Sequence, residues 1–436
     1  MLDTKGIMEI TTTGMTFRDG ALIDLLQEPF HPDKLLLVRW KEGGITIGPT
    51  IEHAGRIFAP APSGATIPGL MQLPTRVAPE ESPRDLFSAI VDLLKDVLRQ
   101  PKFVTSMLAI LIFASWVSDA LPMAPCFWIL PMPAAPKSAA QRLLNRLCRR
   151  SMLLVALRRG DLAFLPWDWN PTLLLDEPDP QSAMRRVLRH SSRRGECMIV
   201  GRRLLDPYGI RVVLSRELPF EMLPEADVLR ISLMSVAGPN RFLNEATEER
   251  IAEEFQGRLQ GFRLRNFAKV QMTRPQLQNL TPPLQDLGRA LCAAVAGDDE
   301  LMSLVLELLN SQEQQIRADA TSATESVVIE ALLSFCHQVD TREVRCLVIS
   351  RRTEAIYAGR GSKREISPEQ VGWKLKHLGI PVGRIGSAGK GVNLTNAVRQ
   401  QVHELAILHG VLTVASGPVP PCPFCQEFKE RLAVAT

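Results

Sequence analysis

The stretch CFWILPMPAAPKSAAQRLLNRL, residues 126–147, decides the fold. Its apolar run 126–130 predicts a buried strand, and its later residues have the spacing of an amphipathic helix. Further apolar runs predict strands at 172–177, 196–201 and 210–215. Strands that alternate with helices predict an α/β fold with a mostly parallel sheet flanked by helices.

The loop between this strand and helix has the order of a P-loop, which is strand, G-x-x-x-x-G-K-[S/T] and helix. Lys137 and Ser138 stand at the last two positions of that pattern. In such a loop the lysine reaches the phosphates of a nucleotide and the hydroxyl holds Mg²⁺. Lys137 is therefore a candidate phosphate ligand, and Ser138 is a candidate ligand of nucleotide-bound Mg²⁺.

Proline replaces both glycines of the pattern, at Pro131 and Pro136, and Pro133 lies between them. Proline has no N–H group and fixes φ near −65°, so it cannot adopt the positive φ that glycine allows. The N–H groups of residues 137–139 remain at a helix N-terminus, which favours an anion. We therefore expect weak nucleotide binding and inefficient hydrolysis.

A second motif, TLLLDE at 172–177, has four uncharged residues followed by Asp176 and Glu177. This is the Walker B pattern, in which the aspartate holds Mg²⁺ through water and the glutamate polarises the attacking water. Ser215 ends the next predicted strand, and its hydroxyl is a candidate for orienting that water. A solvated strand end is the alternative interpretation of Asp176 and Glu177.

Arginines near the end of a predicted basic helix, 182–195, are candidates for stabilising the charge of the γ-phosphate. Arg193 and Arg194 would do so from a neighbouring subunit. Arg230 is a further candidate. The alternative for the basic helix is a solvated face without a partner.

With these motifs in this order, residues 85–235 resemble the P-loop ATPase domains that accompany primase or replication modules in bacterial phage and plasmid proteins. Those domains are helicase-like members of the AAA+ group. The resemblance implies binding of ATP and Mg²⁺ at a subunit interface of a homo-oligomer, and action on DNA. The matching segments are Lys137-Ser138, LLLDE at 173–177, RHSSRRG at 189–195, LSRE at 214–217 and LPEADVLR at 223–230.

The chain of 436 residues predicts two to four domains, at about 100–200 residues each. Changes in pattern along the chain set the expected boundaries. We expect a small β-rich N-terminal domain at 1–63, a linker at 64–82, a P-loop ATPase-like α/β domain at 83–240, a helical region at 241–320, a winged-helix-like domain at 321–415, and a tail at 416–436.

Positive charge is concentrated in the C-terminal part. Residues 341–400 hold 12 Lys or Arg and 4 Asp or Glu, a net charge of +8, whereas the whole chain carries +4. Ser367, Pro368 and Gln370 predict a capped helix start, and the order of helix, basic turn and helix resembles a winged helix-turn-helix. DNA is the expected partner, and a helical lid with a solvated basic face is the alternative. The candidate DNA contacts are Lys374, Lys376, Arg384 and Lys390.

The eight cysteines include one close pair, Cys422 and Cys425, in the predicted tail. A single CxxC supplies half of a tetrahedral zinc site. The nearest histidines, His403 and His409, are six residues apart and do not share one helical face. We therefore expect a pair of thiols rather than zinc, and cysteines scattered through apolar runs indicate a reducing cytoplasm.

The uncharged segment 103–118 tests whether the chain enters a membrane. Its 16 residues fall short of the roughly 20 that a spanning helix needs, so a buried helix is expected. A membrane-associated protein that uses this segment is the weaker alternative. The N-terminal residues 1–14 have no apolar core of a signal peptide, so a cytoplasmic location is expected.

Two functional hypotheses follow from these motifs. The first is an AAA+-like ATPase, active or degenerate, that acts on DNA in a replication or mobile-element module. The second is a non-catalytic DNA-binding scaffold or regulator that keeps a pseudo-P-loop. The prolines of the loop favour the second hypothesis, and the intact Asp176-Glu177 pair favours the first.

Overall fold

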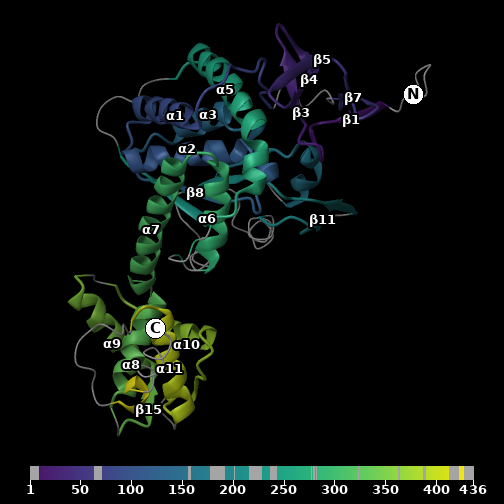
Figure 1. The fold of residues 1–436 in the computed structure, drawn as a ribbon. Helices are drawn as coiled ribbons and strands as arrows, with labels where there is room; N and C mark the ends of the chain where they lie inside the picture. Colours follow the sequence, from purple (N-terminus) through teal and green to yellow (C-terminus); the bar gives the residue numbers. More distant parts are fainter. Residues whose placement is uncertain are drawn as a thin grey trace. The chain divides into compact units, whose positions relative to one another are not determined.

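The computed structural model divides into two compact units, Met1–Gln312 and Glu313–Thr436 (Figure 1), which we call unit 1 and unit 2. Each unit is considered by itself. The structure describes residues 9–62, 71–155, 159–176, 192–200, 202–215, 228–235, 243–275, 277, 280, 282–322, 324–338, 340–361, 364–385, 389–411 and 422–426.

The centre of unit 1 is a five-stranded sheet in which every pair of neighbouring strands is parallel. The strand order is β14-β8-β13-β10-β9. This confirms the α/β fold and the parallel sheet. The strands are β8 (Cys126–Pro131), β9 (Ser151–Val155), β10 (Thr172–Asp176), β13 (Arg211–Leu214) and β14 (Val228–Leu233).

Helices cover one face of this sheet. Because successive side chains of a strand point to opposite faces, Phe127 and Ile129 of β8 join the helical core. Helices α2 and α3 pack against strands of the sheet (Figure 1), and α6 packs against α2 and α5. The helices of unit 1 are α1 (Pro83–Leu98), α2 (Lys102–Trp116), α3 (Lys137–Leu147), α5 (Glu245–Met272) and α6 (Pro282–Ala294). Helix α7 (Asp299–Ser322) begins in unit 1 and ends in unit 2.

Helix α2 is the uncharged segment that raised the membrane question. Every residue from Val104 to Trp116 is buried, which confirms the expected buried helix. Within the described residues, no helix combines the length and the apolar character that crossing a membrane requires. Helix α1 has Pro83 in its first turn, and the Ser82 hydroxyl accepts the N–H of Asp85.

The opposite face of the sheet packs against the N-terminal strands. Cys126 and Trp128 of β8 share a core with Ile23, Leu25 and Leu37. The N-terminal strands therefore belong to unit 1 and cover part of the central sheet. Its strands are β2 (Met15–Thr16), β3 (Leu22–Glu28), β4 (His31–Lys41) and β5 (Gly44–Gly48) in one sheet, and β1 (Glu9–Thr12), β7 (Arg56–Pro60) and β6 (Ile51–His53) in a second.

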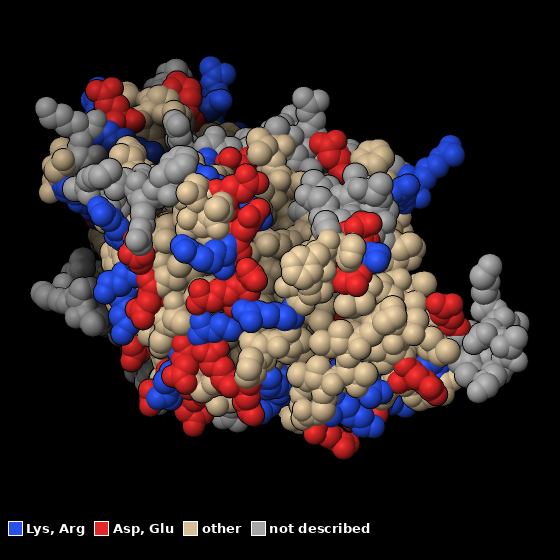
Figure 2. All heavy atoms as spheres, turned by 90° about the horizontal axis from the view of Figure 1, so that it is seen from above, with Lys and Arg blue, Asp and Glu red and all other residues tan. Residues whose placement is uncertain are grey.

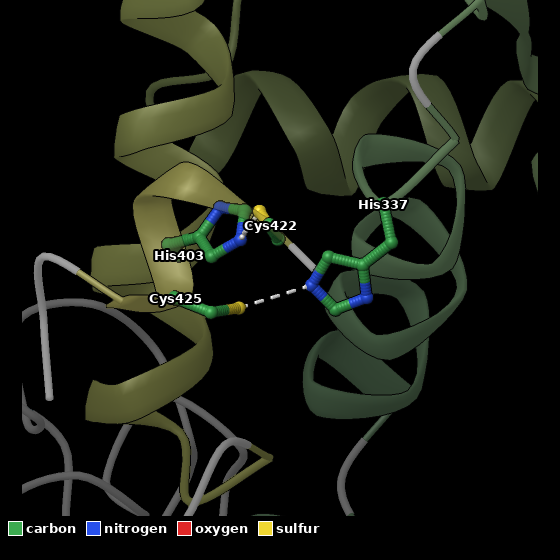
Figure 3. A group of neighbouring side chains, drawn as sticks. All are labelled: His337, His403, Cys422 and Cys425. Atoms are coloured by element: carbon green, nitrogen blue, oxygen red, sulfur yellow. Dashed lines mark hydrogen bonds between the residues drawn. The ribbon is translucent and has the colours of Figure 1, made fainter. Parts of the chain in front are cut away.

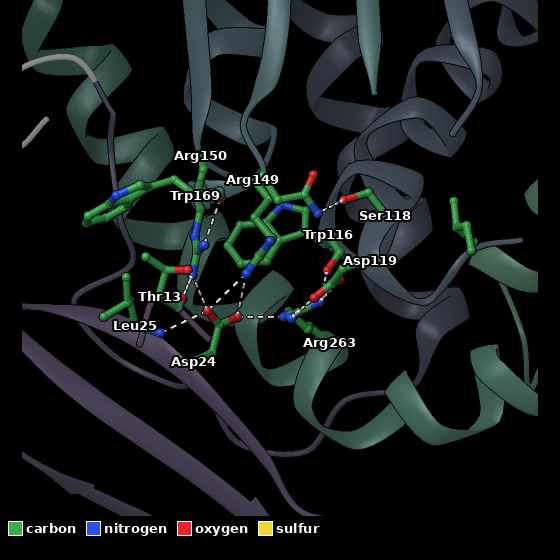
Figure 4. A network of polar contacts seen from close by, with 12 residues as sticks. Thr13, Asp24, Leu25, Trp116, Ser118, Asp119, Arg149, Arg150, Trp169 and Arg263 are labelled. Atoms are coloured by element: carbon green, nitrogen blue, oxygen red, sulfur yellow. Dashed lines mark hydrogen bonds and ion pairs between the residues drawn. The ribbon is translucent and has the colours of Figure 1, made fainter. Parts of the chain in front are cut away.

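A buried charge network joins these parts of unit 1 (Figure 4). Asp24 of β3 accepts hydrogen bonds from Arg149 at 3.0 Å, from Arg150 at 2.6 Å and from Arg263 of α5 at 2.5 Å. Arg263 also makes a two-pronged contact with Asp119, at 2.6 and 2.7 Å. The network links the N-terminal strands, the end of α3 and helix α5 through fixed geometry.

The ionisation of this network follows from its pairing. Burial alone would raise the pKa of Asp24, but the three arginines hold that pKa far below its usual value. Burial lowers the pKa of Arg150 to about 9, and Asp24 opposes that shift. An ion pair this deeply buried is strongly destabilising to break, because the remaining charge has no partner and no water.

Two elements of unit 1 differ from expectation. Helix α3 is followed, after a short turn at Arg149 and Arg150, by strand β9, which was not predicted. The predicted strand 196–201 forms β11 (Met198–Val200), which pairs antiparallel with β12 (Arg203–Leu205) outside the main sheet. The predicted basic helix lies almost entirely outside the described residues.

Unit 2 has the order helix, strand, helix, helix, strand, strand, helix. Its three strands form an antiparallel sheet in the order β15-β17-β16, and the predicted capping box of Ser367 and Gln370 is present. The elements are α8 (Thr324–Cys336), β15 (Glu343–Arg345), α9 (Cys346–Gly359), α10 (Pro368–His377), β16 (Gly383–Arg384), β17 (Lys390–Asn393) and α11 (Asn396–Leu408).

A glycine allows this small sheet to pack closely. A Cβ atom at Gly391 of β17 would lie 2.4 Å from the Val344 carbonyl oxygen and 2.4 Å from Ile385 Cδ1. Only glycine fits at that distance from a neighbouring backbone. The close approach holds the β16–β17 hairpin against β15.

Candidate functional site

The order of the parallel strands marks one edge of the sheet as a place for a ligand. Strands β8 and β13 are neighbours, but the chain leaves β8 toward β9 and leaves β13 toward β14, at opposite ends of the sheet. Ligands of open α/β sheets bind outside the carboxyl ends of strands at such a switch point. The loop 131–138 follows β8 at this point.

Lys137 and Asp176 meet across this edge. Lys137 opens α3, Asp176 ends β10, and Lys137 Nζ lies 2.8 Å from Asp176 Oδ1. Both side chains are about one-quarter exposed, at 24% and 26%. The structure thus brings together the predicted phosphate ligand and the predicted metal ligand, and pairs them with each other. Ser138, the next residue of α3, is exposed.

The loop itself is built from two tight turns. The Ala135 N–H donates to the Met132 carbonyl at 2.9 Å, with Pro133 second in the turn and Ala134 third at φ 61°. Proline followed by a positive φ is the pattern of a type II turn. Pro136 then has φ −78° and ψ 54°, and the Lys137 N–H donates to the Ala135 carbonyl at 2.8 Å, as in an inverse γ-turn.

These turns use the donors that a phosphate cradle needs. The Met132 N–H also donates to a carbonyl, that of Leu233 at 2.9 Å. Six of the eight residues 131–138 therefore offer no N–H group to a phosphate: three are prolines, and three donate to backbone carbonyls. The Lys137 N–H was expected to remain for an anion, and this expectation was wrong because the γ-turn uses it.

Ser215 lies one residue beyond β13, beside β8. Trp128 Nε1 donates to the Ser215 hydroxyl oxygen at 2.7 Å, and the backbone N–H of Ser215 donates to the Ile129 carbonyl at 3.2 Å. The indole therefore fixes the position of this hydroxyl next to the loop. Glu177, the predicted water-polarising residue, lies outside the described residues.

The candidate arginines have partners within unit 1. Arg194 donates to the Asp119 carbonyl and lies over the ring of Tyr208, 4.6 Å from its centre. Burial raises the pKa of Tyr208 to about 12. Arg193 is exposed and lies 3.6 Å from Asp286. Arg230 is in β14, opposite Trp128 of β8.

Three of the four candidate DNA contacts in unit 2 are exposed: Lys376, Arg384 and Lys390. Arg384 and Lys390 are directly opposite each other on the antiparallel pair β16 and β17. Lys374 instead forms an ion pair with Glu325 of α8.

Helix α10 also presents an exposed aromatic side chain. Trp373 is 62% exposed, and its ring contacts that of His377 at a tilt of 60°, with 4.8 Å between ring centres. This helix therefore carries an aromatic pair beside Lys376.

The face of the molecule drawn in Figure 2 carries both positive and negative side chains. Among the atoms coloured in Figure 2, acidic and basic side chains alternate in a dense band beside a broad uncharged area. Mixed charges of this kind do not make a single positive field. Residues 341–400, by contrast, carry a net charge of +8.

A second group of functional side chains lies in unit 2 (Figure 3). His337 follows α8, His403 belongs to α11, and Cys422 and Cys425 lie on a short helical turn. One ligand atom from each residue lies within 4.8 Å of every other. His403, Cys422 and Cys425 are buried, and His337 is partly buried. We call these four residues the His/Cys cluster.

The expectation that the CxxC has no complementary ligands was wrong. His403 does lie beside Cys422, with 3.4 Å between Nε2 and Sγ, and the fourth residue is His337 rather than His409. His337 is 66 positions before His403, and local spacing gives no signal for a residue that far away. Burial lowers the pKa values of both His337 and His403, so both imidazoles are neutral at pH 7.

Three solved structures resemble this chain at low sequence identity. No family model and no curated protein matches it. The C-terminal region of NrS-1 is 11% identical with a TM-score of 0.34, over 85% of this chain and 95% of that one. A full-length MCM homolog from Methanopyrus kandleri is 12% identical with a TM-score of 0.35, over 67% and 77%. Cdc6p from Pyrobaculum aerophilum is 13% identical with a TM-score of 0.20, over 76% and 96%. At these TM-scores the likeness does not assign a function to this chain.

Proposed function

We propose that this chain is a degenerate AAA+-like ATPase that acts on DNA. Its unit 1 keeps a nucleotide-site geometry with little or no hydrolysis, and its unit 2 binds DNA. The observation that carries the proposal is the loop 131–138, where six of eight residues cannot donate an N–H group to a phosphate. A nucleotide at this site would rely on Lys137, Ser138 and Asp176 without the usual backbone cradle.

The state of Lys137 supports this proposal. Its ammonium group is neutralised by Asp176 at 2.8 Å, so a nucleotide phosphate would have to replace an ion pair that already exists. Replacing Asp176 with a phosphate at Lys137 gives a smaller binding free energy than binding a phosphate to an unpaired lysine. We therefore expect weak ATP binding, and Ser138 and Asp176 would hold the Mg²⁺ that accompanies the nucleotide.

DNA binding is supported by the form of unit 2. Its elements follow the order helix, strand, helix, helix and two-stranded hairpin, as in a winged helix-turn-helix, where the third helix enters the major groove. Here that helix is α10, which presents Lys376, and the hairpin is β16–β17. Lys374 is held by Glu325 and is left out of the proposed contacts.

The hairpin carries an additional indication of an anionic partner. Arg384 and Lys390 are opposite each other in register, and like charges at such a pair are destabilising. A DNA phosphate between them would remove the repulsion. Helix α10 and the hairpin would then hold DNA at Lys376, Arg384 and Lys390.

A working ATPase is the second candidate, favoured by one observation. Support for it comes from Lys137, Asp176 and Ser215, which lie at or beyond the carboxyl ends of neighbouring strands near the switch point. In this candidate Glu177 polarises the water, Ser215 orients it, and Arg193 or Arg194 of a neighbouring subunit stabilises the γ-phosphate. The partners of Arg194 within its own subunit count against that last role.

The DNA-binding half is tested by charge reversal. The triple variant Lys376→Glu/Arg384→Glu/Lys390→Glu should lose most of its affinity for DNA, measured by fluorescence anisotropy with a labelled duplex. If each side chain neutralises one phosphate, the slope of log affinity against log salt should fall by about 3. The affinity of the wild-type chain should not depend on ATP.

A matched control reverses three exposed charges of unit 1, in the variant Arg56→Glu/Lys95→Glu/Lys102→Glu. This control should bind DNA nearly as the wild type does. Equal losses in both triple variants would mean that net charge alone attracts DNA, and would contradict an interface at α10 and the hairpin.

A further inference from the structure

We propose that His337, His403, Cys422 and Cys425 bind one zinc ion, which fastens the C-terminal segment 422–426 to unit 2. The proposal does not depend on the nucleotide site or on DNA binding. It rests on the positions of four side chains that come from three separate parts of the chain.

The distances fit a tetrahedral ion. Zinc lies about 2.3 Å from a thiolate sulfur and about 2.0 Å from an imidazole nitrogen, so two ligand atoms of a tetrahedron are about 3.3–3.8 Å apart. Cys422 Sγ is 3.4 Å from His403 Nε2, and Cys425 Sγ is 3.3 Å from His337 Nε2. Since every pair lies within 4.8 Å, small side-chain movements would complete the tetrahedron.

The histidine on α11 already has the orientation that a metal ligand needs. His403 Nδ1 lies 2.7 Å from the Arg399 carbonyl oxygen, one turn earlier in the helix. A proton on Nδ1 that is donated to this carbonyl leaves the lone pair on Nε2, which faces Cys422. Histidines that ligate metals are held in this way by a second hydrogen bond.

A buried arginine fixes the two sides of the cluster to each other. The Arg399 guanidinium donates to the carbonyl oxygens of Cys336 and Thr341, on either side of His337 in the sequence. It also donates to the Leu394 carbonyl at 3.2 Å. The end of α8 and the start of α11 are therefore held together independently of any metal. These contacts keep His337 near His403, with 5.3 Å between their ring centres.

The donor set selects the metal and its role. Two thiolates and two imidazoles are soft and borderline ligands, which suit zinc and not Mg²⁺ or Ca²⁺. Two thiolates also balance the charge of Zn²⁺ where three of the ligands are buried. Four protein ligands leave no position for water or substrate, so the ion would be structural.

The ion would stabilise unit 2 by connecting distant parts of the chain. Within the described residues, the segment 422–426 contributes only a single helical turn, and its two cysteines bring it to the end of α8 and the middle of α11. An ion held by His337, His403, Cys422 and Cys425 would join residues almost 90 positions apart. Metal binding of this kind adds its binding free energy to folding.

The first test is the zinc content of the full-length chain, purified without chelator and without added metal, measured by plasma mass spectrometry. We expect about one zinc per chain in the wild type, and less than one-tenth of that in Cys422→Ser and in Cys425→Ser. The control Cys346→Ser removes a buried cysteine of unit 2 that lies outside the cluster, and it should retain the zinc.

A second readout covers variants that fold poorly. The wild-type chain, stripped of metal and loaded with Co²⁺, should show the visible absorption of tetrahedral cobalt and a thiolate-to-cobalt charge-transfer band. His337→Gln should weaken the visible bands and leave the thiolate band, because both cysteines remain.

Three results would overturn the proposal. The first is a wild-type chain without zinc that also gives no tetrahedral cobalt spectrum. The second is a disulfide between Cys422 and Cys425 in chain purified under reducing conditions. The third is zinc that stays bound in both cysteine variants, since the ion would then lie elsewhere.

Discussion

The loop 131–138 and the His/Cys cluster use their polar atoms in opposite ways. In the loop, the N–H groups of Met132, Ala135 and Lys137 all donate to carbonyls, and the Lys137 ammonium pairs with Asp176. In the cluster, two sulfurs and two ring nitrogens converge within 4.8 Å of one another. The N–H groups of the loop are therefore used within the protein, whereas the cluster brings four possible metal-ligand atoms to one point.

This difference indicates which region is prepared for a ligand. A site binds well when its groups are held in place and remain available to the ligand. The loop is held in place by three prolines and two turns, but its donors are used. The cluster is held by Arg399 and the His403 hydrogen bond, and its donor atoms face inward.

Of the changes considered for the two regions, metal removal should have the largest effect, which is on the stability of unit 2. If free zinc exceeds its dissociation constant by a thousandfold, chelation should lower the free energy of unfolding of unit 2 by about 4 kcal/mol. Differential scanning calorimetry of the full chain, with and without a chelator, measures this change. Unit 1 should unfold at an unchanged temperature.

The control for chelation is Cys425→Ser, which should start at the lower stability and should not respond to the chelator. A chelator effect of equal size in the wild type and in Cys425→Ser would show that the cluster is not the source of the stabilisation.

Restoring the two glycines of the loop should give a smaller effect. The variant Pro131→Gly/Pro136→Gly regains two N–H groups and can adopt positive φ, so its affinity for ATP with Mg²⁺ should rise about tenfold, or about 1.4 kcal/mol. Isothermal titration of the variant and the wild type measures the change.

The matched variant for the loop is Pro122→Gly/Pro125→Gly, which makes the same substitutions in the residues before β8. Its affinity should equal that of the wild type. An unchanged affinity in Pro131→Gly/Pro136→Gly would mean that the missing backbone donors are not what limits nucleotide binding.

The sequence allowed the parallel sheet and helices α3 and α10 to be predicted, because each depends on residues close together in the chain. Ser367 caps α10, and the apolar run 126–130 forms β8. Strand β9 was missed because its apolar residues follow α3 with only a short turn at Arg149 and Arg150 between them.

The remaining features depend on tertiary contacts that no local pattern contains. Asp24 meets Arg263 across 239 positions, and Cys425 meets His337 across 88. The pairing of Lys374 with Glu325 likewise removes a lysine that sequence alone marks as exposed. Local sequence predicts helices and strands, whereas these side-chain contacts depend on how the helices and strands pack together.

The most direct test of the account is ATP turnover by the full-length wild type, with Mg²⁺ and DNA present, measured beside Lys137→Ala and Glu177→Gln. If the loop has lost its phosphate cradle, all three proteins should release phosphate at the same background rate. Turnover in the wild type that disappears in both variants would contradict the account and establish a working ATPase.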